Sequence, residues 1–262
     1  MLQQVKEVFS YKEMLISTVR KELRARYRGS VLGFLWTFIN PIMQLLIYSI
    51  IFPYLLRMNS VENYPIFVFT GLLPWIFFTG SLTASTTCVV GNGNLVKKIY
   101  FPRMILPLSI ATTNLVNYFF GLIIVIPALF IMKISLSPWI LLMPLIMLIQ
   151  YAFVIGFCMV LSALYVYFRD LEHIITIVTT VWFYLTPIVY PIETLSGANR
   201  YVQLAVNSNP MKQFVDAYRN VLMYSSAPDA KGFLYVTVLS VIVLLGGTAI
   251  FSKLQRSFAE EI

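Results

Sequence analysis

The sequence predicts an all-α integral membrane protein with six transmembrane helices. Hydrophobic residues make up 59% of the chain and charged residues only 11%, with a mean hydropathy of +0.80, whereas a soluble domain carries about 25% charged residues. Several uncharged apolar runs exceed the ~20 residues that a helix needs to cross a bilayer. Because such runs occupy most of the 262 residues, we expect one membrane domain over residues 31–262, preceded by an interface segment over residues 1–30.

The interface segment is predicted to be an amphipathic helix on the cytoplasmic membrane surface. Its apolar residues recur at three- and four-residue steps, with lysines and arginines between them. A helix of this kind rests on anionic headgroups, and it also offers a surface to a cytoplasmic partner protein; both interpretations remain open. The segment lacks the apolar core and cleavage site of a signal peptide.

Six apolar segments follow, and we expect each of them to span the membrane. Their approximate bounds are 31–56, 65–90, 104–132, 139–167, 171–190 and 233–254. The first span carries a polar stripe on one helix face, which would face another helix or a wet pathway rather than lipid. The fifth span ends at a proline-rich break that includes Pro187 and Pro191.

Between the fifth and sixth spans, residues 192–232 are too apolar for a disordered loop and are interrupted by Gly197, Pro210 and Pro228. We expect two short helices here, roughly 199–206 and 211–224, at or dipping into the membrane interface. With the amino terminus inside, the inner segments hold about twice as many basic residues as the outer ones. The positive-inside bias therefore places both termini in the cytoplasm.

The expected spans hold no Asp, Glu, Lys, Arg or His away from their ends, so they lack the groups with which ion-coupled carriers bind a coupling ion. The single histidine, His173, lies beside Glu172 at a helix start, where a solvated or capping role fits better than catalysis. The GNGN segment at 91–94 is not a phosphate-binding loop. We therefore expect no catalytic site, no metal and no cofactor in this chain, and no nucleic-acid partner.

The chain is rich in aromatic residues, with 20 Phe, 16 Tyr and 4 Trp. Interfacial belts account for most of them, but several cluster beside the polar stripes. Aromatic rings next to hydroxyl and amide groups without charges suit a sugar chain and do not suit a naked ion. The residues predicted to line a translocation path are Trp36, Asn40, Gln44, Tyr48, Trp75, Phe78, Phe183 and Tyr184. The alternative is that these residues only pack helix against helix.

Two inner loops, residues 97–103 (KKIYFPR) and 167–172 (YFRDLE), combine charged and aromatic residues. Ordinary positive-inside turns are one interpretation. A turn that needed only charge would not keep Tyr100, Phe101 and Phe168 at the surface, so we interpret both loops as protein contact surfaces.

The segment 26–36 (RYRGSVLGFLW), followed by Pro41 and Tyr48, resembles the start of the ABC-2 type permeases that export polysaccharides. Further segments match that family in order and at suitable spacing; these are Lys97/Lys98 with Phe101 and Pro102, 167–170 (YFRD), 186–190 (TPIVY) and 209–211 (NPM). The resemblance covers essentially the whole chain.

The resemblance implies a homodimer paired with two copies of a separate ATPase subunit, which binds ATP and Mg²⁺, in the bacterial cytoplasmic membrane. It implies that the segment between spans 2 and 3 is a coupling helix, and that the two short helices between spans 5 and 6 form an outer gate. The expected ATPase contacts are Arg24, Arg28, Lys97, Lys98, Tyr100, Phe101, Arg103, Arg169 and Asp170. The expected gate residues are Pro187, Tyr190, Asn209 and Pro210.

The implied cargo is a glycopolymer on an undecaprenyl-diphosphate carrier, with wall teichoic acid favoured over O-antigen or another polysaccharide. One alternative is an ABC-2 exporter of a drug or small lipid, which would make no special use of the 26–36 motif. Another class, a membrane-embedded enzyme acting on lipid-linked sugars, would need paired acidic residues at one membrane depth, and the expected spans offer none. A structural scaffold is the remaining alternative.

Overall fold

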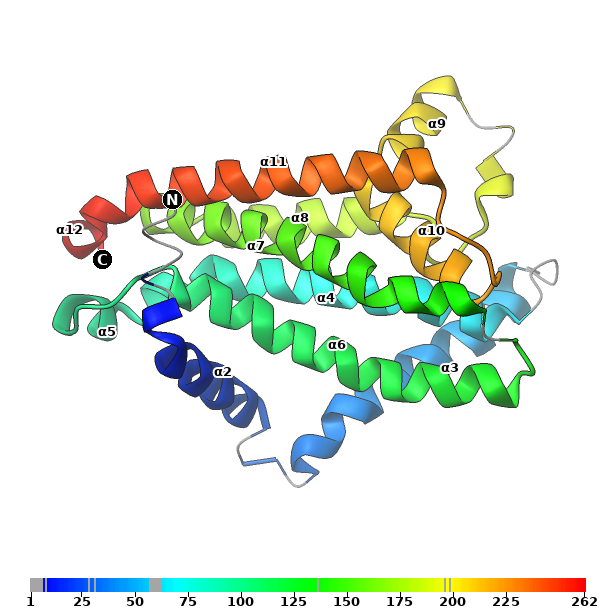
Figure 1. Ribbon diagram of the computed structural model, residues 1–262, viewed down its shortest axis with the longest axis horizontal. Coiled ribbons are helices and arrows are strands. Elements are labelled where there is room, and N and C mark those ends of the chain that lie inside the picture. Colours follow the sequence, from blue (N-terminus) through cyan, green and yellow to red (C-terminus); the bar gives the residue numbers. More distant parts are fainter. Residues whose placement is uncertain are drawn as a thin grey trace.

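The computed structural model describes residues 7, 9–27, 29–30, 32–56, 63–135, 137–195, 197 and 199–262, and this part of the chain is helical with connecting turns (Figure 1). The α-helices are α2 Lys12–Tyr27, α3 Trp36–Leu56, α4 Tyr64–Gly91, α5 Gly93–Lys98, α6 Ile105–Ile131, α7 Met143–Tyr167, α8 Leu171–Tyr184, α9 Arg200–Asn207, α10 Pro210–Leu222, α11 Ala230–Leu254 and α12 Phe258–Glu261. Short 3₁₀ turns cover Gly33–Leu35, Pro138–Leu142, Ile192–Leu195 and Gln255–Ser257.

Four helical segments in the described part are long and apolar enough to cross a membrane. They are Tyr64–Gly91, Ile105–Ile131, Pro138–Tyr167 and Ala230–Ser257, and they coincide with the expected spans 2, 3, 4 and 6. The protein is therefore a multi-pass integral membrane protein. Their long axes run side by side along the longest dimension of the molecule (Figure 1).

The two other expected spans correspond to α3 and α8. Helix α3 has 21 residues, and its described apolar part is Trp36–Ile47. Helix α8 has 14 residues, about 21 Å at 1.5 Å per residue, which is less than the ~30 Å hydrocarbon core. The expectation that the fifth span continues to about residue 190 is wrong for the helix, which ends at Tyr184, because Pro187 has no N–H and disfavours helix in the residue before it. The count of six spans stays a prediction.

Helix α4 lies at the centre of the bundle and packs against α3, α6, α7, α8 and α10. Its side chains Phe69, Phe77 and Phe78 are almost completely buried. The Gln150 side chain of α7 donates its Nε2–H to the Pro74 carbonyl of α4 at 2.9 Å and accepts from the Tyr218 hydroxyl of α10 at 2.9 Å. Buried polar groups need such partners, so these bonds fix the register of three helices.

Helices α7 and α11 lie in close contact at Gly156 and Gly247. A β-carbon on either glycine would collide with the backbone of the opposite helix. Small residues at a helix contact allow backbones to touch, which is how helices associate in a membrane without a hydrophobic driving force between them.

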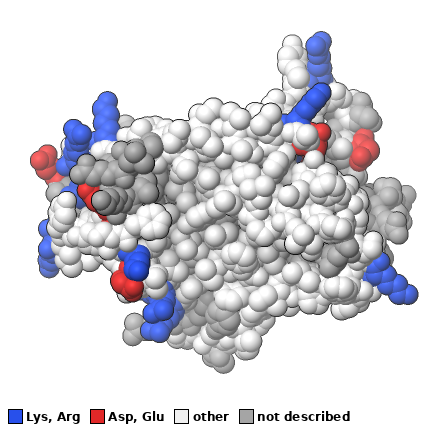
Figure 2. All heavy atoms as spheres, in the orientation of Figure 1, with Lys and Arg blue, Asp and Glu red and all other residues white. Residues whose placement is uncertain are grey.

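Charged side chains gather at the two ends of the molecule, and the face shown in Figure 2 has an uncharged belt between them. We call the end that carries α5 and α12 the inner end, and the end that carries α9 the outer end (Figure 1). The belt exposes large apolar residues such as Phe119, Ile123, Val241 and Ile242. An apolar surface of this extent is typical of contact with lipid or with another membrane-spanning chain.

Candidate functional site

The inner end is built by α5, the loop that follows it and the C-terminal helix α12. Lys97 and Lys98 lie exposed in the last turn of α5, and the Tyr100 side chain is 89% exposed. Phe101 is buried in a second apolar core with Val96 and Met104. The expectation that both neighbouring rings lie at the surface is therefore wrong for Phe101, because the loop turns its side chain toward the bundle.

The C-terminal segment that includes α12 packs against this loop, a contact that the sequence analysis did not predict. The Arg103 guanidinium donates to the Gln255 carbonyl and lies over the Phe258 ring, 5.9 Å from its centroid. Phe258 is fully buried and meets Phe251 edge to face at 5.5 Å, and the Tyr167 hydroxyl donates to the Leu254 carbonyl at 2.9 Å. The signal available was the seven-residue step from Phe251 to Phe258, which is two helical turns.

The second inner loop joins α7 to α8 and carries Phe168, Arg169 and Asp170 on the surface. Phe168 is 65% exposed, as expected for a contact surface, and the Arg169 guanidinium lies 5.4 Å from the centroid of the Tyr165 ring. On α2, Arg24 is exposed. Arg28 lies outside the described residues.

Helix α2 is joined to the end of α4 by a bond from the Lys21 ammonium to the Asn92 side-chain oxygen at 3.3 Å, and it packs against α6. The amino-terminal segment therefore contacts the same inner end as the two loops. The expected ATPase contacts in the two loops lie at this end, with Phe101 turned inward, whereas Arg24 lies farther along α2.

The residues expected along a translocation path fall into two groups. Phe78 has no exposed surface and packs on Phe153 at 6.0 Å and on Trp182 at 5.1 Å. Trp75 is 5% exposed and meets Phe183 at 5.7 Å. These contacts join α4 to α7 and α8, which is the arrangement that the packing alternative describes.

The second group lies on outward faces of α3 and α8. Tyr184 is 66% exposed and Trp36 37% exposed, and Asn40 and Gln44 are also exposed. Tyr48 lies in α3, but its side chain is outside the described part. The structure thus separates an outward-facing polar and aromatic set from a buried ring cluster that supports it.

At the outer end, Asn209 fastens the start of α10 to the break after α8. Its side-chain oxygen accepts from the Trp182 indole N–H at 2.8 Å and from the Met211 N–H at 2.9 Å. Its Nδ2 donates to the Leu185 carbonyl at 3.1 Å and to the Thr186 hydroxyl at 2.8 Å. Pro210 and Tyr190, two of the other expected gate residues, lie in the same region.

Pro210 is the first residue of α10, a position that suits proline, and the Tyr190 hydroxyl donates to the Tyr184 carbonyl at 2.7 Å.

Arg219, also on α10, holds the next part of the same break and was not foreseen. It is 3% exposed and donates to the carbonyls of Pro187 and Ile188, each at 2.7 Å, and of Phe67 at 3.1 and 3.3 Å. Its guanidinium carbon lies 3.5 Å from the centroid of the Phe67 ring. Burial lowers the pKa of Arg219 to about 10, so the side chain is still cationic at neutral pH.

From the sequence alone, Arg219 is one of the basic residues of the expected outer segments. A signal was present, because Arg219 follows Val215 by four residues and precedes Leu222 by three, which places it within the apolar stripe of α10. An arginine in that stripe must find acceptors, since a buried charged group without hydrogen bonds is very costly.

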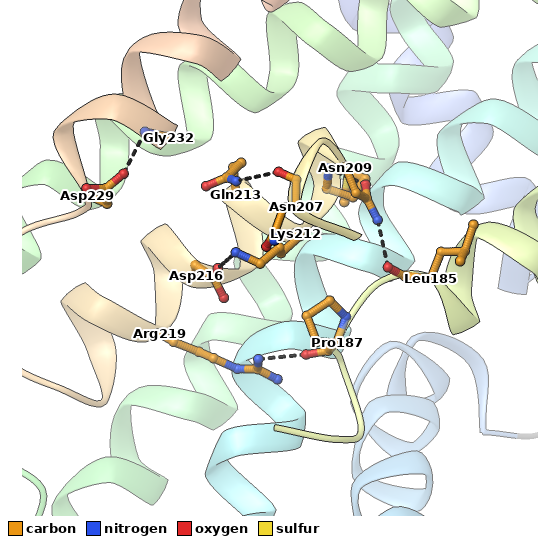
Figure 3. A network of polar contacts seen from close by, with 11 residues as sticks. Leu185, Pro187, Asn207, Asn209, Lys212, Gln213, Asp216, Arg219, Asp229 and Gly232 are labelled. Carbon is orange, nitrogen blue, oxygen red and sulfur yellow. Dashed lines mark hydrogen bonds and ion pairs between the residues drawn. The ribbon is translucent and has the colours of Figure 1, made fainter. Parts of the chain in front are cut away.

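Beside Arg219, a cavity of about 1070 Å³ opens at the outer end between α10, the turn after α6 and the break after α8. Its lining carries charges of both signs, which are Lys133, Lys212, Arg219, Glu193, Asp216 and Asp229. Lys212 pairs with Asp216 at 2.9 Å, and the Asp229 carboxylate caps α11 by accepting from the Gly232 N–H at 2.7 Å (Figure 3). In the part of the chain that the structure describes, no three His, Cys, Asp or Glu residues gather as metal ligands would.

Comparison with known proteins gives concordant results. Residues 14–223 match the model of the ABC-2 type transporter family. The chain is 37% identical to the O-antigen export system permease protein RfbA of Myxococcus xanthus, over 100% of both chains. It is 32% identical to the O-antigen export system permease protein RfbA of Klebsiella pneumoniae, over 95% of this chain and 94% of that one. It is 22% identical to the capsule polysaccharide export inner-membrane protein CtrC of Neisseria meningitidis, over 94% and 92% of the two chains.

Proposed function

Because this chain belongs to the ABC-2 type transporter family, we propose that it is the membrane-spanning permease subunit of an ATP-driven polysaccharide exporter. The observation that carries this proposal is the match to an O-antigen export permease over the full length of both chains. The uncharged belt between two charged ends (Figure 2) suits a chain that crosses the membrane several times. The protein would reside in the bacterial cytoplasmic membrane, with the inner end and both termini in the cytoplasm.

The cargo we propose is an O-antigen-type polysaccharide on an undecaprenyl-diphosphate carrier. The sequence motifs favoured wall teichoic acid, but the relatives described above are named for O-antigen and capsule polysaccharide. We therefore place O-antigen first and teichoic acid second. Both are long hydroxyl-rich polymers, so the demands on the pathway are similar.

Energy would come from two copies of a separate ATPase subunit that docks on the inner end. The exposed ring of Tyr100 beside Lys97 and Lys98 suits a pocket on such a partner, because an apolar ring and cationic groups together give both buried area and orientation. Phe101 and Arg103 would act from behind, by holding the loop against α12. Motion of the ATPase would thus reach α6, α7 and α11 through one rigid cluster.

A second copy of the chain would cover the outward faces of α3 and α8. Only Ile175 and Thr179 of α8 are buried in the single chain, while Ile177, Val181 and Tyr184 are among its exposed residues. The polar and aromatic side chains of α3 and α8 would then line a path between the copies, with Trp75 packed behind Phe183 and Phe78 packed behind Trp182. The α8–α10 junction at Asn209 and Arg219 would form the outer gate.

The experiment that tests the proposal is deletion of the gene followed by complementation. The mutant cells should lose surface polysaccharide and accumulate lipid-linked polymer on the cytoplasmic side. Expression of this chain should reverse both defects. The purified chain alone should hydrolyse no ATP, and it should co-purify with an ATPase subunit in a two-to-two complex. Unchanged surface polysaccharide in the deletion strain would refute the proposed function.

A further inference from the structure

A second cavity, of about 490 Å³, lies between α3, α4 and α6 and is called here the α3–α6 pocket. Its lining residues are Ser30, Trp36, Thr37, Asn40, Pro41, Leu73, Ile76, Phe77, Asn114, Asn117 and Tyr118. None of these eleven is charged, which separates this pocket from the outer cavity beside Arg219. Its volume lies within the range of small-molecule sites, ~300–1,000 Å³.

Within the part of the chain that the structure describes, two of its side chains hold buried polar atoms that have no hydrogen-bond partner. These are the Thr37 hydroxyl and both the oxygen and the nitrogen of the Asn117 amide, and Thr37 is only 6% exposed. Threonines elsewhere in these helices bond a carbonyl of the preceding turn; Thr112, for example, donates to Leu108 at 2.7 Å. Because native proteins seldom bury unpaired polar groups, such groups call for a partner that binds there.

Three aromatic side chains contribute to the walls of the pocket. The Phe77 and Tyr118 rings are stacked at 5.8 Å with an interplanar angle of 5°. Trp36 stands at the pocket with its indole N–H bonded to the Ser30 hydroxyl at 3.0 Å, and it is 37% exposed. Ring faces and neutral hydrogen-bonding groups together match the two kinds of surface on a sugar, its C–H faces and its hydroxyl groups.

We propose that the α3–α6 pocket binds one uncharged sugar residue of the exported polymer, through the Thr37 hydroxyl and the Asn117 amide. This inference rests on the proposed function and adds a subsite to it. The absence of charge from the lining disfavours a phosphate or carboxylate group, which would be left without a cationic partner. The sugar's hydroxyl or N-acetyl groups would supply both a donor and an acceptor, as the Asn117 amide requires.

The first test uses Thr37→Val and Asn117→Leu in the full complex. Each variant removes polar atoms that have no partner among the described residues, so the melting temperature should stay equal or rise. Thr37→Val should weaken sugar binding about fivefold, the factor expected for one ordinary hydrogen bond, and Asn117→Leu should weaken it more because it removes both a donor and an acceptor. The double variant should reduce export more strongly than either single one. Thr37→Ser keeps the hydroxyl and should export normally.

A matched control is Thr86→Val on α4. Thr86 is also fully buried, but its hydroxyl donates to the Leu82 carbonyl at 2.8 Å and lies away from the pocket. This variant should leave export unchanged and should not raise the melting temperature. For Thr37→Val, by contrast, export should fall while the melting temperature stays equal or rises. A purely structural role of Thr37 would not produce this combination.

Binding can be measured directly through Trp36. Oligosaccharide fragments of the surface polysaccharide made by the same cells, added to the purified complex, should change its tryptophan fluorescence. The change should disappear in Trp36→Phe and weaken in Asn117→Leu. No change in the unmodified complex would overturn the inference.

The outcomes separate the inference from the proposed function. If deletion of the gene leaves surface polysaccharide unchanged, the proposed function itself fails. If deletion abolishes export but the Thr37→Val, Asn117→Leu double variant exports normally, only the pocket inference fails, as it would if the pocket held water alone. If Thr37→Ser is as defective as Thr37→Val, the hydroxyl is not the cause, and the inference is wrong.

Discussion

Asn209, the N-cap of α10, and Arg219, ten residues further along the chain, donate to carbonyl groups that lie two residues apart in the break after α8. Asn209 Nδ2 donates to the Leu185 carbonyl at 3.1 Å, and Arg219 Nη1 donates to the Pro187 carbonyl at 2.7 Å (Figure 3). These donors satisfy carbonyl groups at and just beyond the C-terminal end of α8, where the helix itself supplies no partners. The break is therefore a built junction rather than a frayed end.

Replacing Arg219 by Met should destabilise the protein by about 3 kcal/mol or more, because the carbonyls of Phe67, Pro187 and Ile188 lose their donors at once. The stability of Arg219→Lys should lie between those of Arg219→Met and the wild type, since an ammonium group cannot reproduce the planar set of donors of a guanidinium. The check is the melting temperature of the purified protein in detergent, with Lys212→Met as the more exposed control. An Arg219→Met protein that melts within about 2 °C of wild type would show that the junction contributes little.

Neighbouring glycines of α11 should respond oppositely to the same substitution. Gly247→Ala should lower the melting temperature and reduce the yield of folded protein, because its β-carbon would collide with the backbone at Gly156. Gly246→Ala meets nothing within 4 Å and should be neutral or stabilising by about 0.5–1 kcal/mol. Equal effects of the two substitutions would contradict the close approach of α7 and α11.

Tyr100 and Phe101 should have separable roles. Tyr100→Ala should leave the melting temperature unchanged, because the exposed Tyr100 ring does not pack in the core. It should uncouple ATP hydrolysis from export, because the ring would dock on the ATPase subunit. Phe101→Ala should cost about 3–5 kcal/mol of stability, as for other buried phenylalanines, because the ring is 5% exposed. Thermal melting of the purified chain and ATPase and export assays on the complex distinguish them. Normal coupling in Tyr100→Ala would place the ATPase contact elsewhere.

A similar contrast applies to Phe78 and Tyr184. Tyr184→Ala should slow export modestly without loss of dimer, since a single exposed ring gives a passing sugar only weak contact and a path must release as readily as it binds. Phe78→Ala should lower stability by about 3–5 kcal/mol and reduce export in proportion to lost folded protein. Dimer yield and export are measured side by side. If Tyr184→Ala loses dimer and export in parallel, its role is packing.

Orientation can be tested with two highly exposed tyrosines at opposite ends, in a background without Cys88 and Cys158. Tyr201→Cys on α9 should react with a membrane-impermeant maleimide in intact cells, whereas Tyr100→Cys should react only after permeabilisation. Their exposed fractions, 80% and 89%, make reactivity comparable. External labelling at position 100 would reverse the orientation.

The sequence by itself determined which segments are long apolar helices and where the chain must break. Hydropathy over about 20 residues identifies α4, α6, α7 and α11, and prolines mark the end of α8 and the start of α10. These properties depend on residues adjacent in the chain, so they need no knowledge of the fold. The family resemblance was likewise carried by short local motifs.

Only the tertiary structure decided which side chains face inward. Arg219 bonds the Phe67 carbonyl across 152 positions of sequence, and Phe101 turns inward while Tyr100 does not. Thr37 and Asn117 both line one pocket between separate helices. In a membrane protein, residues that face lipid and residues that face other helices are both apolar, because lipid tails are as apolar as leucine. Hydropathy therefore reports the depth of a residue but not its partner, and partners are set by how the helices pack.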